Sequence, residues 1–320
     1  MTVPKLWSLA QTRIFPILRS RYERVTLEIK SRQKNDPFPT LAAKAFRGHL
    51  DIVIGYDHGQ TISRIHAATA TEWDVPLDEI IHRARANLRA LPIPVWLPAG
   101  DSLWKLESEG GYAESLLQLP EIFDRLPAKG TPLAMIPNPG VLLATGTDES
   151  RGLAALFAAA TKSILEGPWP PCGDLFEVTP TGIQDHVPDG PAAKLLATIQ
   201  RLEMASVYDA QKAALRAHHE ALYDAVYVAS YRIVGKRGSP NESQSWCSWT
   251  HGVPSLLPTT DLIVFVWDLN RTRKTAPVPW TDAERLVGHY FKSTAEDPAR
   301  TRVDAFPTPD ELAELQRQTV

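Results

Sequence analysis

The chain has 320 residues, of which 43% are hydrophobic and 22% are charged, and its formal net charge is −3. This length favours two domains, each large enough to bury a core of its own. The near balance of 34 basic and 37 acidic side chains gives no electrostatic reason to expect nucleic acid as a partner. No apolar run approaches the roughly 18–20 residues of a membrane helix, so we expect no membrane partner.

Cysteine usage predicts the compartment. Cys172 and Cys247 are the only two cysteines and form no Cys-x-x-Cys pair. This excludes a disulfide scaffold and a four-cysteine zinc site, and it is typical of a reducing environment. We therefore expect a cytoplasmic protein.

The N-terminal segment is rich in basic residues. Residues 1–24 hold five basic side chains and a single acidic one, a bias that resembles a transit peptide. However, Trp7, Ala10, Ile14 and Leu18 share one helical stripe, which favours an amphipathic first helix on the domain surface.

Two strands and two helices are predicted next. Aliphatic and β-branched residues favour strands at 24–30 and 51–56. A helix is expected to begin near Pro76, because proline suits the first helical position, where a missing N–H costs nothing. Apolar residues at helical spacing predict another helix over 112–126, and Pro120 is expected to kink or divide it.

A turn rich in proline and glycine follows. The segment Pro137-Asn-Pro-Gly140 separates apolar runs at 133–136 and 141–145, which predicts a pair of strands joined by a tight turn. Thr147 or Asp148 is placed to cap the alanine-rich helix that comes next.

The pattern of this turn occurs twice. Ile136–Thr145 and Leu257–Val266 both run from an aliphatic residue and Pro, through two turn residues and Gly or Asp, into an apolar strand. Each is followed by a helix with a capping residue, Thr147 or Thr281. The repeat predicts two related halves, each with an aliphatic β-ribbon beneath a helix.

The domain boundary is expected in a stretch of irregular composition. Residues 167–191 are dense in proline and glycine around one short strand pair, 175–178 and 183–187. We place the boundary here, which gives an N-terminal domain of residues 1–175 and a C-terminal domain of residues 176–320.

The C-terminal domain begins with a long predicted helix that has Pro191 at its first position. Strands are expected at 225–234, 245–250 and 262–267. Capping boxes, in which Thr and Glu satisfy each other's backbone N–H groups, then predict two helix starts. These boxes are Thr281–Glu284 and Thr308–Glu311.

The order of elements indicates the fold class. Helices mixed with strands that are mostly joined by hairpins are typical of α+β proteins. We predict two α+β domains, each with helices packed on a mostly antiparallel or mixed sheet. A doubly wound nucleotide-binding fold is disfavoured, because no regular strand–helix alternation with a glycine-rich first turn is present.

Four segments carry a family resemblance. They are Glu72–Glu79, Ala86–Leu88, Glu114–Leu117 and Ala134–Gly146. In this order they resemble the YtpQ-like bacterial family, a domain of unknown function, over roughly residues 50–165. The resemblance implies a cytoplasmic α+β protein with no established activity, and it brings no catalytic residue to this chain. The C-terminal half matches no family known to us.

Residues 246–252, Trp-Cys-Ser-Trp-Thr-His-Gly, are the segment densest in reactive side chains. A thiolate nucleophile needs a base, so Cys247 and His251 are the candidate catalytic residues. In a strand, however, residues four apart lie about 13 Å from each other, at roughly 3.3 Å per residue. A dyad would need a partner from elsewhere in the chain, and a packed structural cysteine is the favoured interpretation.

The same segment predicts a binding cleft. Strand alternation places Cys247, Trp249 and His251 on one face and Trp246 on the other. Downstream tryptophans are expected to join an aromatic cluster, which is more often core than a binding site. We predict a Trp-lined cleft with His251 at its edge. The candidate binding residues are Trp246, Trp249 and Trp267.

No cofactor or metal site is predicted. His218 and His219 are adjacent on a predicted helix, where their side chains diverge by about 100° and cannot chelate one ion. The sequence has no His-Glu-x-x-His, Gly-x-Ser-x-Gly, Walker or Gly-x-Gly-x-x-Gly motif. The predicted function is a non-catalytic binding or interaction protein with an unknown protein or small-molecule partner. The alternative is a small-molecule or thiol-dependent enzyme with its site around Cys247, Trp249 and His251.

Overall fold

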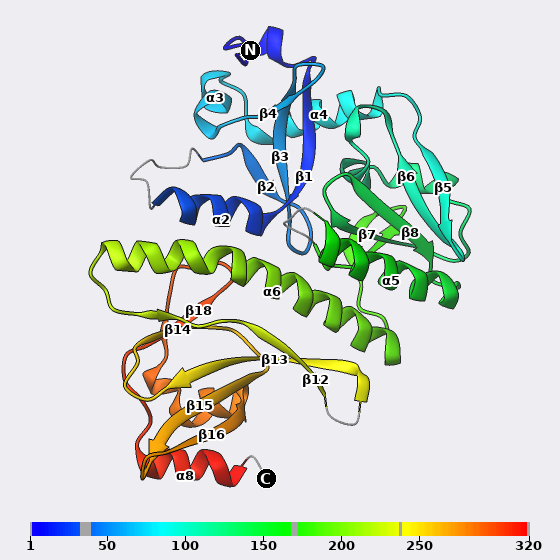
Figure 1. Ribbon diagram of the computed structural model, residues 1–320. Coiled ribbons are helices and arrows are strands. Elements are labelled where there is room, and N and C mark those ends of the chain that lie inside the picture. The colour runs from blue at the N-terminus through cyan, green and yellow to red at the C-terminus, as the bar shows by residue number, and fades with distance from the viewer. Residues whose placement is uncertain (1, 33–39, 168–171, 237–238, 319–320) are drawn as a thin grey trace. The chain divides into compact units, whose positions relative to one another are not determined.

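Figure 1 shows a computed structural model of the protein, which describes residues 2–32, 40–167, 172–236 and 239–318. The chain divides into two compact units. Unit 1 comprises Met1–Glu23 and Phe38–Gln200, and unit 2 comprises Arg24–Pro37 and Arg201–Val320. Two of the boundaries fall inside helices, α2 (Arg21–Arg32) and α6 (Gly190–Ala221). The division into residues 1–175 and 176–320 stays a prediction.

The first sheet of unit 1 has four antiparallel strands. In spatial order they are β1 (Ile14–Ser20), β3 (Leu50–Asp57) and β2 (Ala43–Ala45), with β4 (Ile62–Arg64) also paired to β3. Helix α4 (Leu77–Arg89) begins directly after Pro76 and packs on β1 and β3. It buries an apolar stripe at helical spacing, as expected of a helix that covers a sheet: Ile80, Ile81, Ala84 and Leu88. Two shorter helices are α1 (Trp7–Ala10) and α3 (Ala67–Glu72).

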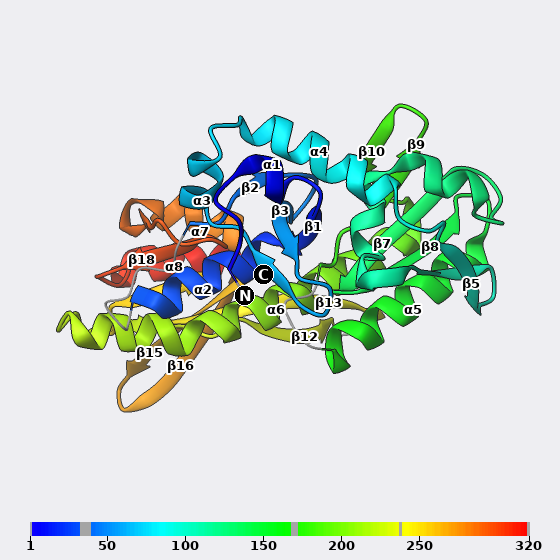
Figure 2. The same cartoon turned by 90° about the horizontal axis from the view of Figure 1, so that it is seen from above.

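The second sheet of unit 1 has six antiparallel strands. In spatial order they are β10 (Gly182–Asp185), β9 (Phe176–Thr179), β7 (Pro132–Asn138), β8 (Val141–Gly146), β6 (Leu103–Glu107) and β5 (Val95–Gly100). Helix α5 (Ser150–Glu166) packs along β7 and β8, as Figure 2 shows from above. Short 3₁₀ turns lie between β6 and β7: Glu109–Gly111, Glu114–Gln118 and Pro120–Arg125. One hydrophobic core joins both sheets, with members such as Leu18, Ile54, Leu117, Ala134 and Phe176.

Unit 2 contains two four-stranded sheets. The first has the order β11 (Tyr227–Val228), β14 (Ser255–Pro258), β18 (Arg300–Val303) and β17 (Lys292–Ser293). The second has the order β12 (Arg232–Lys236), β13 (Ser239–Thr250), β15 (Leu262–Leu269) and β16 (Thr272–Pro279). Each sheet is mixed, because β11 pairs with β14, and β13 with β15, in parallel. Helices α7 (Trp280–Val287) and α8 (Pro309–Gln318) pack against the second sheet (Figure 1), with a 3₁₀ turn at Gly288–Tyr290.

Both units layer helices on antiparallel or mixed sheets, so the α+β class is confirmed. Within the described ranges, every helix is too short or too polar to cross a membrane. The predicted strands at 51–56, 245–250 and 262–267 lie within β3, β13 and β15. The predicted run at 225–234 is divided between β11 and β12, with no strand between them.

Two predictions near the N-terminus are wrong. Of the helical stripe predicted from Trp7 to Leu18, only residues 7–10 form a helix, and Ile14–Ser20 form the edge strand β1. Pro16 is tolerated in β1 because an edge strand need not donate every N–H. Residues 24–30 lie in helix α2 and not in a strand. Val25 and Ile29, four positions apart, pack together in a core with Leu215. The apolar residues that alternate in this segment therefore also fit the spacing of one helix face.

The predicted helix over 112–126 is also wrong. The chain forms 3₁₀ turns there, and Pro120 opens the second of them, since proline removes a helical hydrogen bond and clashes with the preceding turn. Of the two capping boxes, Thr308–Glu311 forms, with both reciprocal N–H contacts present. Helix α7 begins at Trp280 without a side-chain cap, and α5 follows Glu149 in the same way. The caps predicted for these two helices are therefore wrong.

The predicted repeat does not correspond to a repeated structure. Ile136–Thr145 passes from β7 into β8, which pair with each other as an antiparallel hairpin. Leu257–Val266 passes from β14 into β15, which belong to different sheets. The shared pattern describes only a proline-containing turn before an apolar strand, and such a turn is compatible with either connection.

Candidate functional site

The inward face of the second sheet of unit 2 carries the residues singled out from the sequence. In β13 the side chains alternate as predicted: Cys247 and Trp249 are buried, and Trp246 lies half-buried on the other face. The neighbouring strand β15 is in register, with Ile263 beside Cys247 and Phe265 beside Trp249. The same face continues past the end of β13 to His251 and Trp267, because the His251 amide donates to the carbonyl of Val266.

Cys247 lies at the buried end of this face. Its side chain has no exposed surface, and the Thr260 hydroxyl donates to the sulfur at 3.4 Å. Burial raises the pKa of the Cys247 thiol to about 12, more than the nearby Thr260 and Arg300 lower it. Buried thiols are poor nucleophiles because only the thiolate reacts. His251 is exposed and lies at the other end of the face, so β13 does not bring the two together.

Trp249 forms the centre of an aromatic cluster. Its ring is fully buried and stands 5.1 Å from Phe265, 5.7 Å from Phe291 and 5.8 Å from Phe306, between ring centroids. Such tilted and edge-on pairs are favourable geometries for aromatic rings in a core. Trp249 therefore supports Phe306 from beneath and offers no surface to a ligand.

A groove opens where this face leaves the core. It has a volume of about 350 Å³, within the roughly 300–1,000 Å³ range of small-molecule sites. The sheet contributes His251, Trp267, Asp268 and Leu269. The opposite wall comes from the C-terminal segment: Phe306, Pro307, Pro309, Leu312, Ala313 and Gln316.

The capping box positions this opposite wall. The Thr308 amide donates to the Glu311 carboxylate at 2.8 Å, and the Glu311 amide donates to the Thr308 hydroxyl at 3.4 Å. Helix α8 therefore begins immediately after the Phe306-Pro307 pair. Leu312 and Gln316, four positions apart on one helix face, then point toward the groove. Leu312 is also a member of the core beneath.

The groove is mostly apolar, with few polar groups. The His251 ring stands edge-on to Phe306, with 5.2 Å between centroids. Asp268 and Gln316 supply a carboxylate and an amide at the rim. The Asp268 carboxylate lies 3.8 Å from Arg273, and both side chains are largely solvated, so this ion pair is weak. Aromatic walls with a small number of polar groups are the usual composition of a ligand site.

Two larger clefts are less suited to a ligand. One, of about 440 Å³ in unit 1, is lined by the ion pair Arg89–Glu121 at 2.7 Å. The other, of about 670 Å³ in unit 2, is lined by the pair Arg216–Glu220 at 2.8 Å. In each cleft this ion pair already neutralises part of the charge of the lining.

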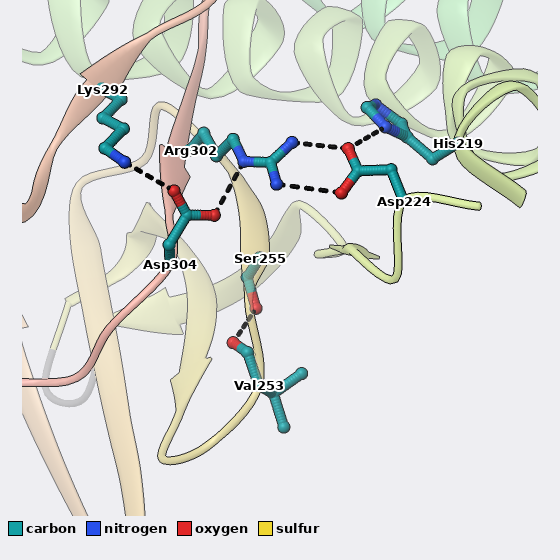
Figure 3. A network of polar contacts seen from close by, with 7 residues as sticks. All are labelled: His219, Asp224, Val253, Ser255, Lys292, Arg302 and Asp304. Carbon is teal, nitrogen blue, oxygen red and sulfur yellow. Dashed lines mark hydrogen bonds and ion pairs between the residues drawn. The ribbon is translucent and has the colours of Figure 1, made fainter. Parts of the chain in front are cut away.

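A network of ion pairs lies next to the second of these clefts. The Arg302 guanidinium donates two hydrogen bonds to the Asp224 carboxylate and a third, at 2.8 Å, to Asp304 (Figure 3). His219 and Lys292 bind the two carboxylates from the outside, at 3.0 and 2.8 Å. The hydrogen bonds from Arg302 lower the pKa of Asp224 to about 2. Both carboxylates are paired, so the network is structural.

Comparisons of the chain with models of protein families, with curated proteins and with solved structures find no match. The resemblance to the YtpQ-like family therefore stays a prediction. The geometry groups His251 and Trp267 in one groove, buries Trp249 below it and places Trp246 on the opposite face. Phe306 and Gln316 were not predicted, although the capping box at residue 308 indicated where the helix that carries Gln316 starts.

Proposed function

We propose that this protein is a non-catalytic binding protein, and that the groove between His251, Trp267 and Phe306 holds a compact, partly apolar small molecule. The observation that carries the proposal is the continuation of one sheet face from a closed aromatic core into an open groove of ligand size. The burial of Cys247 supports a binding role, because a groove ligand would meet no activated thiol.

The walls indicate what kind of ligand would fit. Trp267 and Phe306 offer planar apolar surfaces, which favour an aromatic or aliphatic ring. His251 and Gln316 can both donate and accept hydrogen bonds, so they suit a ligand with one or two neutral polar atoms. A ligand of this size buried between aromatic walls gains most of its affinity from apolar contact.

The test uses indole, benzoate and benzylamine as probes. The whole protein is labelled with 5-fluorotryptophan, and the ¹⁹F resonances of Trp267 and Trp246 are assigned from the variants Trp267→Phe and Trp246→Phe. We expect at least one probe to shift the Trp267 resonance saturably, with a millimolar Kd, about −4 kcal/mol. The Trp246 resonance is the internal control, because this side chain lies on the opposite face.

A groove-filling variant completes the test. Ala313 is exposed and lines the groove, so Ala313→Phe should occupy the space without disturbing the core and should abolish the shift. If none of the three probes perturbs Trp267, or if binding persists in Ala313→Phe, the proposed site is wrong.

A further inference from the structure

Unit 1 contains a small polar pocket between α4 and β2. Its volume is about 280 Å³. One face of α4 lines it with Asp78, His82 and Arg85, which follow one another at the four- and three-residue spacing of a single helix face. Lys44 projects from β2 on the other side. Apolar side chains complete the lining: Phe46, Ile52 and Ile81.

The guanidinium of Arg85 is held in a fixed orientation. Its Nε donates to the Gln118 side-chain oxygen at 3.2 Å. Gln118 is itself buried, and its amide nitrogen donates to the carbonyls of Ser115 and Pro16 at 3.2 and 3.4 Å. The amide oxygen is therefore directed at Arg85. A rotamer-rich side chain that is already ordered loses less entropy when it binds a ligand.

The charge of Arg85 is not neutralised. Its partner is a neutral amide, and among the residues that the structure describes no carboxylate acts on its charge. Burial, together with the nearby Arg89, lowers the pKa of Arg85. An anion beside this guanidinium would be stabilised by a positive charge whose hydrogen-bond partner is only a neutral amide.

The second cation of the pocket has a partner. Lys44 binds Asp78 at 2.6 Å, and both side chains are more than half exposed. An exposed pair of this kind is worth little, so Lys44 can turn toward an anion at small cost. Lys44 and Arg85 against Asp78 leave the pocket with a net positive charge.

We infer that this pocket binds a small oxyanion, a phosphate or carboxylate group, on the guanidinium of Arg85 with Lys44 as a second ligand. The planar fork of arginine matches two oxygens of either group. The apolar floor formed by Phe46, Ile52 and Ile81 would accept a short organic part of the ligand. The site lies in unit 1 and does not depend on the groove proposed above.

The experiment titrates the full-length protein with inorganic phosphate, sodium acetate and sodium chloride at constant ionic strength and neutral pH. The readouts are isothermal titration calorimetry and the Nε–H resonance of Arg85. We expect phosphate or acetate to bind more tightly than chloride and to shift this resonance. Tighter binding of phosphate would indicate a phosphoryl ligand, and tighter binding of acetate a carboxylate ligand.

Three variants locate the site. Arg85→Gln should weaken oxyanion binding about tenfold, and Arg85→Lys should weaken it less, because charge remains while the two-pronged contact is lost. Arg83→Gln is the matched control: it removes the same charge from the same helix, from a side chain that binds the Gln11 carbonyl and lies outside the pocket. It should leave the affinity within about twofold of the unaltered protein, because a side chain two positions away on a helix points to a different face from Arg85 and makes no contact with the ligand.

The inference fails if phosphate and acetate bind no better than chloride, or if a folded Arg85→Gln protein keeps the full affinity. Should Arg85→Gln fail to fold, as judged by circular dichroism, Lys44→Gln takes its place. Lys44 is exposed and its loss leaves the core untouched. Unchanged oxyanion affinity in Lys44→Gln would then overturn the inference, and a loss of several-fold would support it.

Discussion

The chemical state of Cys247 distinguishes a binding protein from a thiol-dependent enzyme. The perturbation is iodoacetamide, applied to the native protein at pH 8. Burial raises the Cys247 pKa from 9.0 to about 12. At this pH the thiolate fraction falls from about 10% to about 0.01%, so ionisation alone slows alkylation about a thousandfold. The sulfur also has no exposed surface, so reaction additionally requires local opening of the core.

Intact-protein and peptide mass spectrometry measure this rate. The two cysteines fall in different tryptic peptides, so Cys247 and the buried Cys172 are followed separately, with glutathione in the same tube as an exposed reference thiol. We expect Cys247 to be modified at least about a thousandfold more slowly than glutathione, and at a comparable rate only in guanidinium chloride. Native alkylation within about tenfold of glutathione would refute the reasoning and restore the enzyme interpretation.

Two further predictions concern the stability of unit 2. Asp224→Asn should lower the free energy of unfolding by about 1 kcal/mol at pH 7, after allowance for partial exposure. Because the folded-state pKa of Asp224 is lowered to about 2 from 3.8, its contribution to the free energy of unfolding is complete above pH 4 and is lost as the pH falls through 2. Urea titrations of both proteins at pH 7, 4 and 3 should show their difference in unfolding free energy shrinking only below pH 4. A difference that stays constant with pH would contradict this. Thr308→Ala should lower the free energy of unfolding by about 1 kcal/mol, because it removes the cap of α8. Thr281→Ala should leave it nearly unchanged, because no side-chain cap forms at the start of α7. Equal losses of stability in thermal unfolding would show that the cap geometry is not the cause.

Local sequence patterns predicted the elements whose partners lie close in the chain. The stripe of α4 and the hairpin of β7 and β8 depend on helical periodicity and on turn chemistry, both of which are read within a short window. Residues 24–30 show the limit of such reading. Val25 and Ile29 fit either a strand face or a helix face. The ion pair between Arg24 and Glu28, at 2.9 Å and four positions apart, is a helical signal that the apolar alternation outweighed.

The apparent repeat was a different kind of error. Ile136–Thr145 and Leu257–Val266 share a turn pattern because both must leave one element and enter an apolar strand. Which strand then pairs with which is decided by contacts far along the chain, as β15 pairs with β13 and β16 while β14 pairs with β18 and β11. A pattern of about ten residues contains no information about such pairing.

The groove also shows that a local pattern can identify which face of a strand is buried without showing where along that face the core ends. Alternation correctly assigned Cys247 and Trp249 to one face of β13, which continues to His251 past the end of the strand, but it does not say how far the core extends along that face. The core ends where Phe306 and α8 cease to cover the sheet. Phe306 and α8 belong to a segment more than 50 positions downstream of β13. Cys247, the most reactive side chain of the segment by chemistry, is therefore fully buried. Phe306 and Gln316, which line the opposite wall of the groove, were inconspicuous in the sequence because their accessibility depends on how the C-terminal segment packs against the sheet. Attention to residue type alone thus singled out β13 and favoured its buried end, whereas the proposed groove lies beyond its other end.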